Sequence, residues 1–165
     1  MNSDEPNRRS LSVLQVVGPS DSGKTTLLER LVERLGERTD GRVATVKAIH
    51  HDVEPDTPGR DTHRHRTAGA DAAIGVTPSL TFRIARGGKG DDDVAALESV
   101  LAELERDGYD VALVEGFTAA ELSAVVLGTA DPDEAERERH GRVIATGETA
   151  DDVDIEAILE YLTPR

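Results

Sequence analysis

The sequence predicts an α/β fold, a single domain whose mostly parallel sheet is flanked by helices. Apolar runs of strand length alternate along the chain with segments whose apolar residues recur at helical spacing, and this alternation is typical of α/β folds. A chain of 165 residues has the length of one domain. We expect a polar tail over residues 1–10 and one folded domain over residues 11–165.

The first predicted strand, loop and helix are continuous in the sequence. The strand is an apolar run made of Val13, Leu14, Val16 and Val17. The helix has an apolar face made of Leu27, Leu28, Leu31, Val32 and Leu35. Between them, residues 18–25 read G-P-S-D-S-G-K-T, which is the full phosphate-binding pattern G-x-x-x-x-G-K-[S/T]. Because the loop amides and the helix N-terminus converge on one anion in such a unit, we predict a P-loop NTPase-type domain that binds a nucleoside di- or triphosphate.

Each part of this loop has an expected role. The amides of residues 21–26 cradle the α- and β-phosphates, Lys24 neutralises the β- and γ-phosphates, and the Thr25 hydroxyl binds Mg²⁺. Gly18 and Gly23 let the backbone bend tightly and approach the phosphate. The alternative, a glycine turn before an ordinary helix, is disfavoured by the flanking strand and helix. The nucleotide-binding candidates in the loop are Gly18, Pro19, Ser20, Asp21, Ser22, Gly23, Lys24, Thr25 and Thr26.

The middle of the chain predicts three strands and a short helix. Residues 42–48 are rich in β-branched side chains and predict a second strand. A polar loop with prolines follows over residues 49–61, and a short polar helix is expected over residues 60–68. Residues 72–76 and 80–85 predict two strands joined by the turn Thr77-Pro78-Ser79.

The last third of the chain predicts two further helices and three strands. The first helix begins at three aspartates, residues 91–93, whose charge suits a helix N-terminus, and it ends at Gly108. In the second, which closes the chain before Pro164, Ile155, Ile158, Leu159 and Leu162 line up on one face. The acidic segment 128–141 predicts a surface loop or a frayed helix. Apolar runs predict strands over residues 111–114, 122–127 and 143–145.

The composition is unusually acidic. The chain has 33 Asp and Glu against 19 Lys and Arg, a formal net charge of −14, and its only lysines are Lys24, Lys47 and Lys89. An acidic surface that is poor in lysine suits concentrated salt, where self-repulsion is screened, so we expect a halophilic source. The alternative, an acidic face for a basic partner, fits less well because the acid is spread along the whole chain. Repulsion from phosphates excludes nucleic acid as an expected partner.

Other features bound the location. The chain has no cysteine, which excludes disulfides and thiolate metal sites. Its polar N-terminus lacks the apolar core of a signal peptide, and no stretch approaches the roughly 20 apolar residues of a membrane span. We expect a cytoplasmic protein without a membrane partner.

Glu115 is the second candidate for the site. It follows the apolar run of residues 111–114 and would emerge at the carboxyl end of a central parallel strand, at the sheet edge that also carries the phosphate loop. An acid at this place commonly holds Mg²⁺. The alternative is a solvated acid at a strand end.

The segment from Lys47 to Arg66 is the third candidate. His50, His51, Asp52 and Asp61 follow the second strand, where phosphate-binding enzymes often carry a switch whose acid is oriented on Mg²⁺ or on the attacking water. In the alternative interpretation, these histidines simply face solvent. The basic cluster formed by Arg60, His63, Arg64, His65 and Arg66 suggests either a bound anion or ion pairs with neighbouring aspartates.

These motifs together resemble the MobB family, the molybdopterin-guanine dinucleotide biosynthesis adapter proteins. The similar runs are K-A-I-H-H-D-V-E-P-D-T-P-G-R-D-T over residues 47–62, R-H-R-T-A-G-A-D over 64–71, V-T-P over 76–78 and V-E-G-F over 114–117. With the phosphate loop, the resemblance covers most of residues 11–117. The middle runs are more specific than the phosphate loop alone.

The resemblance implies a GTP-binding, Mg²⁺-dependent and usually dimeric protein with weak GTPase activity. The family assists a MobA-type molybdopterin guanylyltransferase, which attaches GMP to molybdopterin, so the implied partners are that enzyme and molybdopterin or its guanine dinucleotide. Lys47, His50, His51, Asp61 and Arg66 match the family's central motif and join the phosphate loop as ligand-binding candidates. The catalytic candidates are Lys24, Asp52 and Glu115, and the metal candidates are Thr25, Asp52 and Glu115.

The chain also departs from the family's pattern. The family often carries a lysine after V-E-G-F and a later proline-lysine pair, whereas here Thr118 follows and residues 119–126 contain neither lysine nor proline. No N-K-x-D motif is present, so guanine preference rests on the resemblance alone. As an enzyme the chain is expected to be at most a slow GTPase. The alternative function is a P-loop small-molecule kinase or an ATP-dependent ligase.

Overall fold

The computed structural model describes residues 10–131, 133 and 141–163. Most of the predicted tail and most of the predicted acidic loop at 128–141 lie outside these described residues. The chain forms two compact units. The first combines the residues up to Ala48 with those from Asp92 onward, and the second is Ile49–Asp91.

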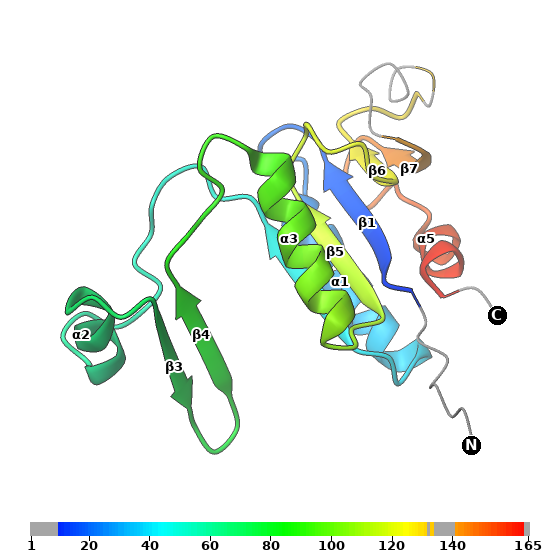
Figure 1. Cartoon of the computed structure of the whole chain (residues 1–165). Coiled ribbons are helices and arrows are strands. Elements are labelled where there is room, and N and C mark those ends of the chain that lie inside the picture. The colour runs from blue at the N-terminus through cyan, green and yellow to red at the C-terminus, as the bar shows by residue number, and fades with distance from the viewer. Residues whose placement is uncertain (1–9, 132, 134–140, 164–165) are drawn as a thin grey trace, which may run out of the picture. The chain divides into compact units, whose positions relative to one another are not determined.

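The first unit is built on a parallel five-stranded sheet (Figure 1). The strand order is β2-β5-β1-β6-β7. β5 lies between β1 and β2, and Glu115 is in register with Val16 on one side and Lys47 on the other. The predicted fold class is therefore confirmed. The strands are β1 (Ser12–Val17), β2 (Val43–Lys47), β5 (Val111–Glu115), β6 (Ala124–Leu127) and β7 (Val143–Gly147).

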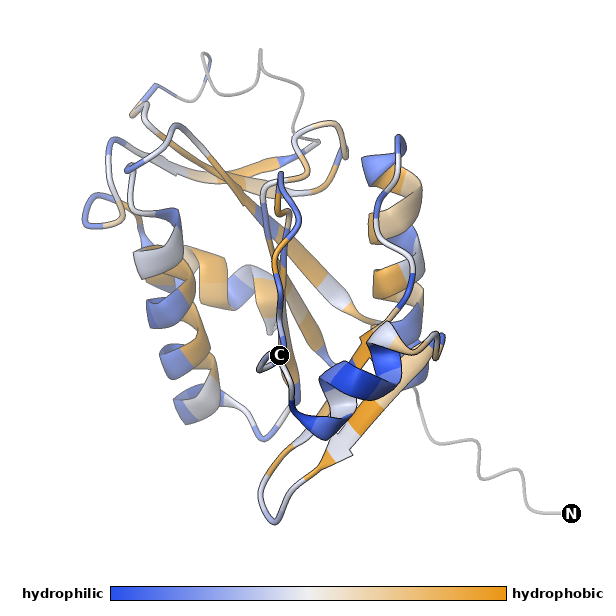
Figure 2. Ribbon diagram, turned by 90° about the vertical axis from the view of Figure 1, so that its left-hand side faces the viewer, coloured by the Kyte–Doolittle hydropathy of each residue, from blue (hydrophilic) through white to orange (hydrophobic). Residues whose placement is uncertain are grey.

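Helices cover both faces of this sheet. The helices α1 (Lys24–Arg38) and α5 (Ile155–Leu162) share one hydrophobic core with the inward side chains of β1 and β5. The helix α3 (Asp93–Arg106) packs on the other face, where Leu97 meets Val114 and Phe117. Figure 2 shows that hydrophobic residues are concentrated in the strands of the sheet. The predicted apolar face of the first helix is correct except for Val32, which is 38% exposed, because the sheet ends at β2 and leaves that side of α1 uncovered.

The second unit contains α2 (Asp61–Thr67) and an antiparallel pair of strands, β3 (Ala72–Val76) and β4 (Thr81–Ala85). Within the pair, Gly75 lies opposite Phe82, and a Cβ atom at residue 75 would stand 2.2 Å from the Phe82 ring. The ring therefore covers the glycine, which leaves no room for a side chain there. The sequence predicted all three elements but did not show that they form a unit of their own.

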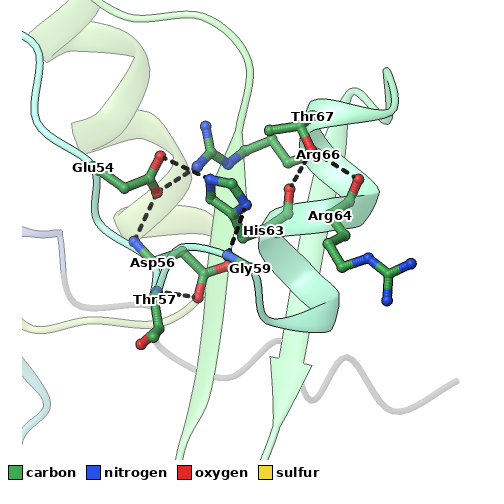
Figure 3. A network of polar contacts seen from close by, with 8 residues as sticks. All are labelled: Glu54, Asp56, Thr57, Gly59, His63, Arg64, Arg66 and Thr67. Carbon is green, nitrogen blue, oxygen red and sulfur yellow. Dashed lines mark hydrogen bonds and ion pairs between the residues drawn. The ribbon is translucent and has the colours of Figure 1, made fainter.

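A network of polar contacts joins α2 to the loop before it (Figure 3). Glu54 accepts from the Arg66 guanidinium and from the amide of Asp56 at 2.9 Å, and its other carboxylate oxygen lies 3.7 Å from Nε2 of His63. The His63 Nδ1 atom accepts from the amide of Gly59 at 3.3 Å. The Arg66 guanidinium donates a hydrogen bond to the Glu54 carboxylate and holds its pKa below the ordinary value. For Arg66, the predicted alternative of ion pairing is thus observed, although with a glutamate rather than an aspartate.

Among the described residues, none of the helices combines the length and the apolar character that a membrane crossing requires.

The lowered pKa of Glu54 makes the second unit sensitive to acid. Since the folded pKa lies below the unfolded one, this carboxylate stabilises the unit above its unfolded pKa and loses that effect as the pH falls through the folded pKa. We expect the amides of α2 to lose hydrogen-exchange protection, corrected for intrinsic rates, as the pH falls below the ordinary pKa of a glutamate. In Glu54→Gln, protection should be lower at neutral pH and should depend less on pH, with the remaining dependence due to Asp56, whose pKa is lowered chiefly by a hydrogen bond from the Thr62 side chain. An unchanged pH dependence in that variant would contradict the assignment.

Candidate nucleotide-binding site

The phosphate loop between β1 and α1 has the backbone that the sequence predicts. Three of its residues have positive φ angles, namely Gly18 (150°), Asp21 (63°) and Gly23 (92°). Glycine adopts such angles without steric cost, and aspartate is among the few other residues that tolerate them. The chain therefore turns sharply out of the strand and enters the helix at Lys24.

Two neighbouring loops press against this turn. A Cβ atom at Gly18 would lie 2.6 Å from the carbonyl oxygen of Leu127, at the end of β6, and one at Gly23 would lie 3.2 Å from the Cβ atom of Ala150, after β7. The Pro19 ring also lies close to Gly128, since a Cβ atom added at Gly128 would lie 2.7 Å from the Pro19 Cδ atom. The loop is thus supported by the carboxyl ends of two adjacent strands, and its glycines are required for packing as well as for conformation.

The amino end of α1 is left open. Its N-cap residue is Gly23, no side chain caps it, and no acidic residue occupies its first turn. The helices α3 and α5 are capped, since Asp92 accepts from the amide of Ala95 at 2.9 Å and Asp154 accepts from the amide of Ala157 at 3.1 Å. The short helix α2 also lacks a side-chain cap but carries Asp61 in its first turn. The unpaired amides and the positive end of the helix dipole therefore face outward at α1, which is the arrangement that binds anions.

The Lys24 side chain folds back over the loop. Its ammonium group donates to the carbonyl oxygens of Gly18, at 2.9 Å, and of Pro19. The Ser22 hydroxyl donates to the same Pro19 oxygen at 2.9 Å. The positive charge of Lys24 is thus held next to the open amides of α1, with no carboxylate partner among the described residues, and it adds to their attraction for phosphate.

Glu115 meets Thr25 and Lys47 at the carboxyl edge of the sheet. Glu115 is buried, at 9% exposure. One carboxylate oxygen pairs with the Lys47 ammonium at 2.9 Å, and the other accepts from the Thr25 hydroxyl at 3.3 Å. A hydroxyl and a carboxylate are oxygen ligands of the kind that Mg²⁺ prefers, and Mg²⁺ usually takes few protein ligands because phosphates and waters complete its shell. Thr25 and Glu115 therefore fit a magnesium site, with the Lys47 charge close by.

A groove of about 440 Å³ opens beside this group. Leu28 and Val32 of α1 and Val46 of β2 contribute its apolar lining, and its polar lining residues are Thr25, Glu29, Glu33, Thr45, Lys47 and Glu115. The uncovered side of α1 thus leads directly to the predicted metal ligands.

The second unit holds the remaining site candidates. His50, His51 and Asp52 are exposed in the segment between β2 and α2. Asp61 is exposed at the start of α2, and Arg66 pairs with Glu54. The three predicted catalytic residues are therefore divided, with Lys24 and Glu115 in the first unit and Asp52 in the second. The same division separates Asp52 from Thr25 and Glu115 in the predicted metal set, and the described parts of the chain contain no group of three or more His, Asp or Glu arranged to hold a metal.

Sequence reasoning missed Gln15. This residue interrupts the apolar run of β1, is fully buried, and donates from Nε2 to the carbonyl oxygens of Gly116 and Phe117, directly after Glu115. The signal was a polar residue in the middle of an otherwise apolar strand, since buried polar groups are usually kept for their hydrogen bonds.

Comparison with known proteins places the chain in a family. The family described as molybdopterin guanine dinucleotide synthesis protein B, or MobB, matches residues 13–147. A putative molybdopterin-guanine dinucleotide biosynthesis adapter protein of Methanocaldococcus jannaschii is 34% identical over 110 residues, which cover 67% of this chain and 42% of that protein. The adapter protein of Escherichia coli is 32% identical over 108 residues, covering 66% of this chain and 60% of the relative. The matches thus span less than two thirds of these relatives' length.

Solved structures agree with this result. A crystal structure described as molybdopterin-guanine biosynthesis protein B is 29% identical and superimposes with a TM-score of 0.67. The match covers 91% of this chain and 95% of that one. The structure of Bacillus subtilis MobB is 25% identical, with a TM-score of 0.65 over 94% of this chain and all of that one. The matched residues include β1, the phosphate loop, the second unit and Glu115. The chain belongs to the MobB family.

Proposed function

We propose that this protein binds GTP with Mg²⁺ at residues 18–26 and acts as an adapter in molybdenum cofactor biosynthesis, where it assists the attachment of GMP to molybdopterin. The observation that carries the proposal is the open amino end of α1, with the Lys24 ammonium beside it and no acid in the first helical turn. A polyphosphate would satisfy the free amides and the ammonium together. The adapter role is supported by family membership and by the names of the relatives.

The expected chemistry of the site follows from the contacts. The loop amides and Lys24 would bind the phosphates, and Thr25 and Glu115 would hold a Mg²⁺ ion that would neutralise part of the phosphate charge. The groove beside them is lined by one lysine, Lys47, and by no arginine. Since an arginine commonly stabilises the transition state of fast GTPases, we propose that GTP hydrolysis here is slow.

We further propose that the protein works as a cytoplasmic homodimer with a MobA-type guanylyltransferase and with molybdopterin or its guanine dinucleotide. These partners are proposed from family membership. His50, His51 and Asp52 are exposed and would contact ligand or partner, with Asp52 as the acid that orients Mg²⁺ or the attacking water.

Removing the Lys24 ammonium provides the direct test of the binding site. Lys24→Ala should weaken Mg²⁺-GTP binding by at least about 100-fold, because the loop would lose the ammonium group that pairs with the phosphates. Isothermal titration calorimetry measures the loss, and circular dichroism checks that the fold is intact. Lys89→Ala, at a lysine of the second unit, is the matched control and should bind as the wild type does. Retained affinity in folded Lys24→Ala would refute the assignment.

A kinase or ligase on the same fold is the competing function, and the groove beside Thr25 is where its acceptor would bind. In competition titrations we expect GTP to displace ATP. In a separate assay, we expect phosphate release from GTP to be slow and to remain slow when small-molecule acceptors are added. Preference for ATP, with turnover of roughly 1–100 s⁻¹, would favour the kinase or ligase.

The adapter role predicts a physical complex. A pull-down at high salt with the tagged chain should recover a molybdopterin guanylyltransferase, and its recovery should rise when Mg²⁺-GTP is present. Lys24→Ala should abolish the increase in recovery caused by GTP, while the variant used as bait remains folded. Recovery of no cofactor enzyme under either condition would point instead to a nucleotide switch without this role.

The acidic composition motivates a proposal about salt. With a net charge of −14, self-repulsion should be weaker in concentrated salt, so the thermal midpoint should rise as KCl increases from about 0.1 M to about 1 M. The effect should shrink near the isoelectric point of about 4.7, where the net charge vanishes. A midpoint that falls with salt at neutral pH would contradict the halophilic interpretation.

A further inference from the structure

The residue behind this inference is Gln15, which lies on the opposite face of the sheet from the predicted nucleotide. Gln15 is in register with Val114, whose side chain packs in the α3 core, whereas Glu115 is in register with Val16, whose side chain packs under α1. Successive side chains of a strand point to opposite faces. Gln15 therefore cannot touch a ligand bound at the amino end of α1, and any effect on that site must pass through the backbone.

Gln15 holds the turn that follows Glu115. Its Nε2 atom donates to the carbonyl oxygen of Gly116 at 2.6 Å and to that of Phe117 at 2.8 Å. Both residues are left-handed, with φ angles of 84° and 56°. A bulky residue such as phenylalanine rarely adopts a positive φ, so the surroundings must hold it there. The Gln15 amide contributes by binding both carbonyls of the turn, alongside the amide of Ala120, which also donates to the Phe117 carbonyl at 2.8 Å, and the packing of the Phe117 ring in the core.

The turn at Gly116 and Phe117 follows the last residue of β5. The Glu115 carbonyl oxygen accepts from the amide of Ala48 at 2.9 Å, and a Cβ atom at Gly116 would lie 2.9 Å from the Ala48 Cβ atom. With its left-handed φ angle, Gly116 turns the chain out of the sheet directly after Glu115. This exit leaves the Glu115 carboxylate facing Thr25 and Lys47.

Gln15 is fully buried, and its amide donates to the two carbonyl groups that follow Glu115. A polar side chain buried in an otherwise apolar strand is usually kept for its hydrogen bonds, and both of these bonds end in the turn directly after Glu115.

We propose that Gln15 is a positioning residue of the nucleotide site, which holds Gly116 and Phe117 and thereby places Glu115 for Mg²⁺. The inference rests on the proposed function, because it assumes that Glu115 and Thr25 bind the metal of a Mg²⁺-nucleotide. It adds a residue on the far face of the sheet to those that control metal binding.

The test separates metal-dependent binding from nucleotide binding as such. GTP affinity is measured by calorimetry with Mg²⁺ and with EDTA, and the ratio of the two affinities is the magnesium gain. Gln15→Met, which is similar in size but lacks donors, should lower this gain by about 10-fold, as losses of residues that orient metal ligands do, with affinity in EDTA unchanged within about twofold. Glu115→Gln should behave alike, and the double variant should be no worse than Glu115→Gln, because the two act as one unit.

Two further variants exclude a merely structural effect. Val13→Ala removes packing from the same face of β1 without removing a donor, and it should lower stability but keep the magnesium gain. Gln15→Glu places a buried carboxyl group at the turn, which donates one hydrogen bond when protonated and repels the carbonyls when ionised. Its magnesium gain should recover as the pH falls, unlike that of the wild type. Gln15→Glu also keeps the test possible if Gln15→Met does not fold.

The outcomes distinguish this inference from the function on which it rests. A wild type that does not bind GTP overturns both. Suppose instead that the wild type binds Mg²⁺-GTP. The role of Gln15 is then overturned, and the proposed function is not, if Gln15→Met keeps the wild-type magnesium gain or if the losses of the two single variants add in the double variant.

Discussion

The amino end of α1 is the feature on which the account of this site depends. In a chain with 33 acidic residues, the first turn of this helix contains none and its N-cap is a glycine. A helix terminus without a cap leaves backbone amides unpaired, and these amides need a partner from solvent or from a ligand. Lys24 adds its ammonium group at the same place. The free amides and the Lys24 ammonium therefore offer favourable contacts to phosphate within a protein whose net charge is strongly negative.

The parallel sheet brings the other groups to this terminus. Because β5 lies between β1 and β2, the residues at their carboxyl ends converge, and Glu115 meets Lys47 and the Thr25 hydroxyl. On the other side of β1, the ends of β6 and β7 support the glycines of the phosphate loop. This agrees with the general rule that open α/β sheets bind ligands at the carboxyl ends of their strands. Topology thus explains the site as much as the loop motif does.

Sequence patterns predicted what depends on local chemistry. Glycine spacing predicted a sharp turn between β1 and α1, which the structure has, and an acid after a buried strand predicted that Glu115 lies at the carboxyl edge of the sheet, where it contacts Thr25 and Lys47. Features that depend on long-range packing were missed. The exposure of Val32 follows from β2 being the edge of the sheet, and the role of Gln15 depends on carbonyl groups about a hundred residues away. The ion pair of Arg66 with Glu54 required the fold of the second unit, which periodicity alone does not delimit.

The most direct measurement is a crystal structure of the protein with Mg²⁺ and a non-hydrolysable GTP analogue. Our account predicts the phosphates at the amino end of α1, with the Lys24 ammonium moved from the Gly18 and Pro19 oxygens to the β- and γ-phosphates. It also predicts Mg²⁺ in contact with the Thr25 hydroxyl and with Glu115, directly or through water. A nucleotide bound elsewhere, or a Lys24 that stays on the loop carbonyls beside bound phosphate, would contradict it.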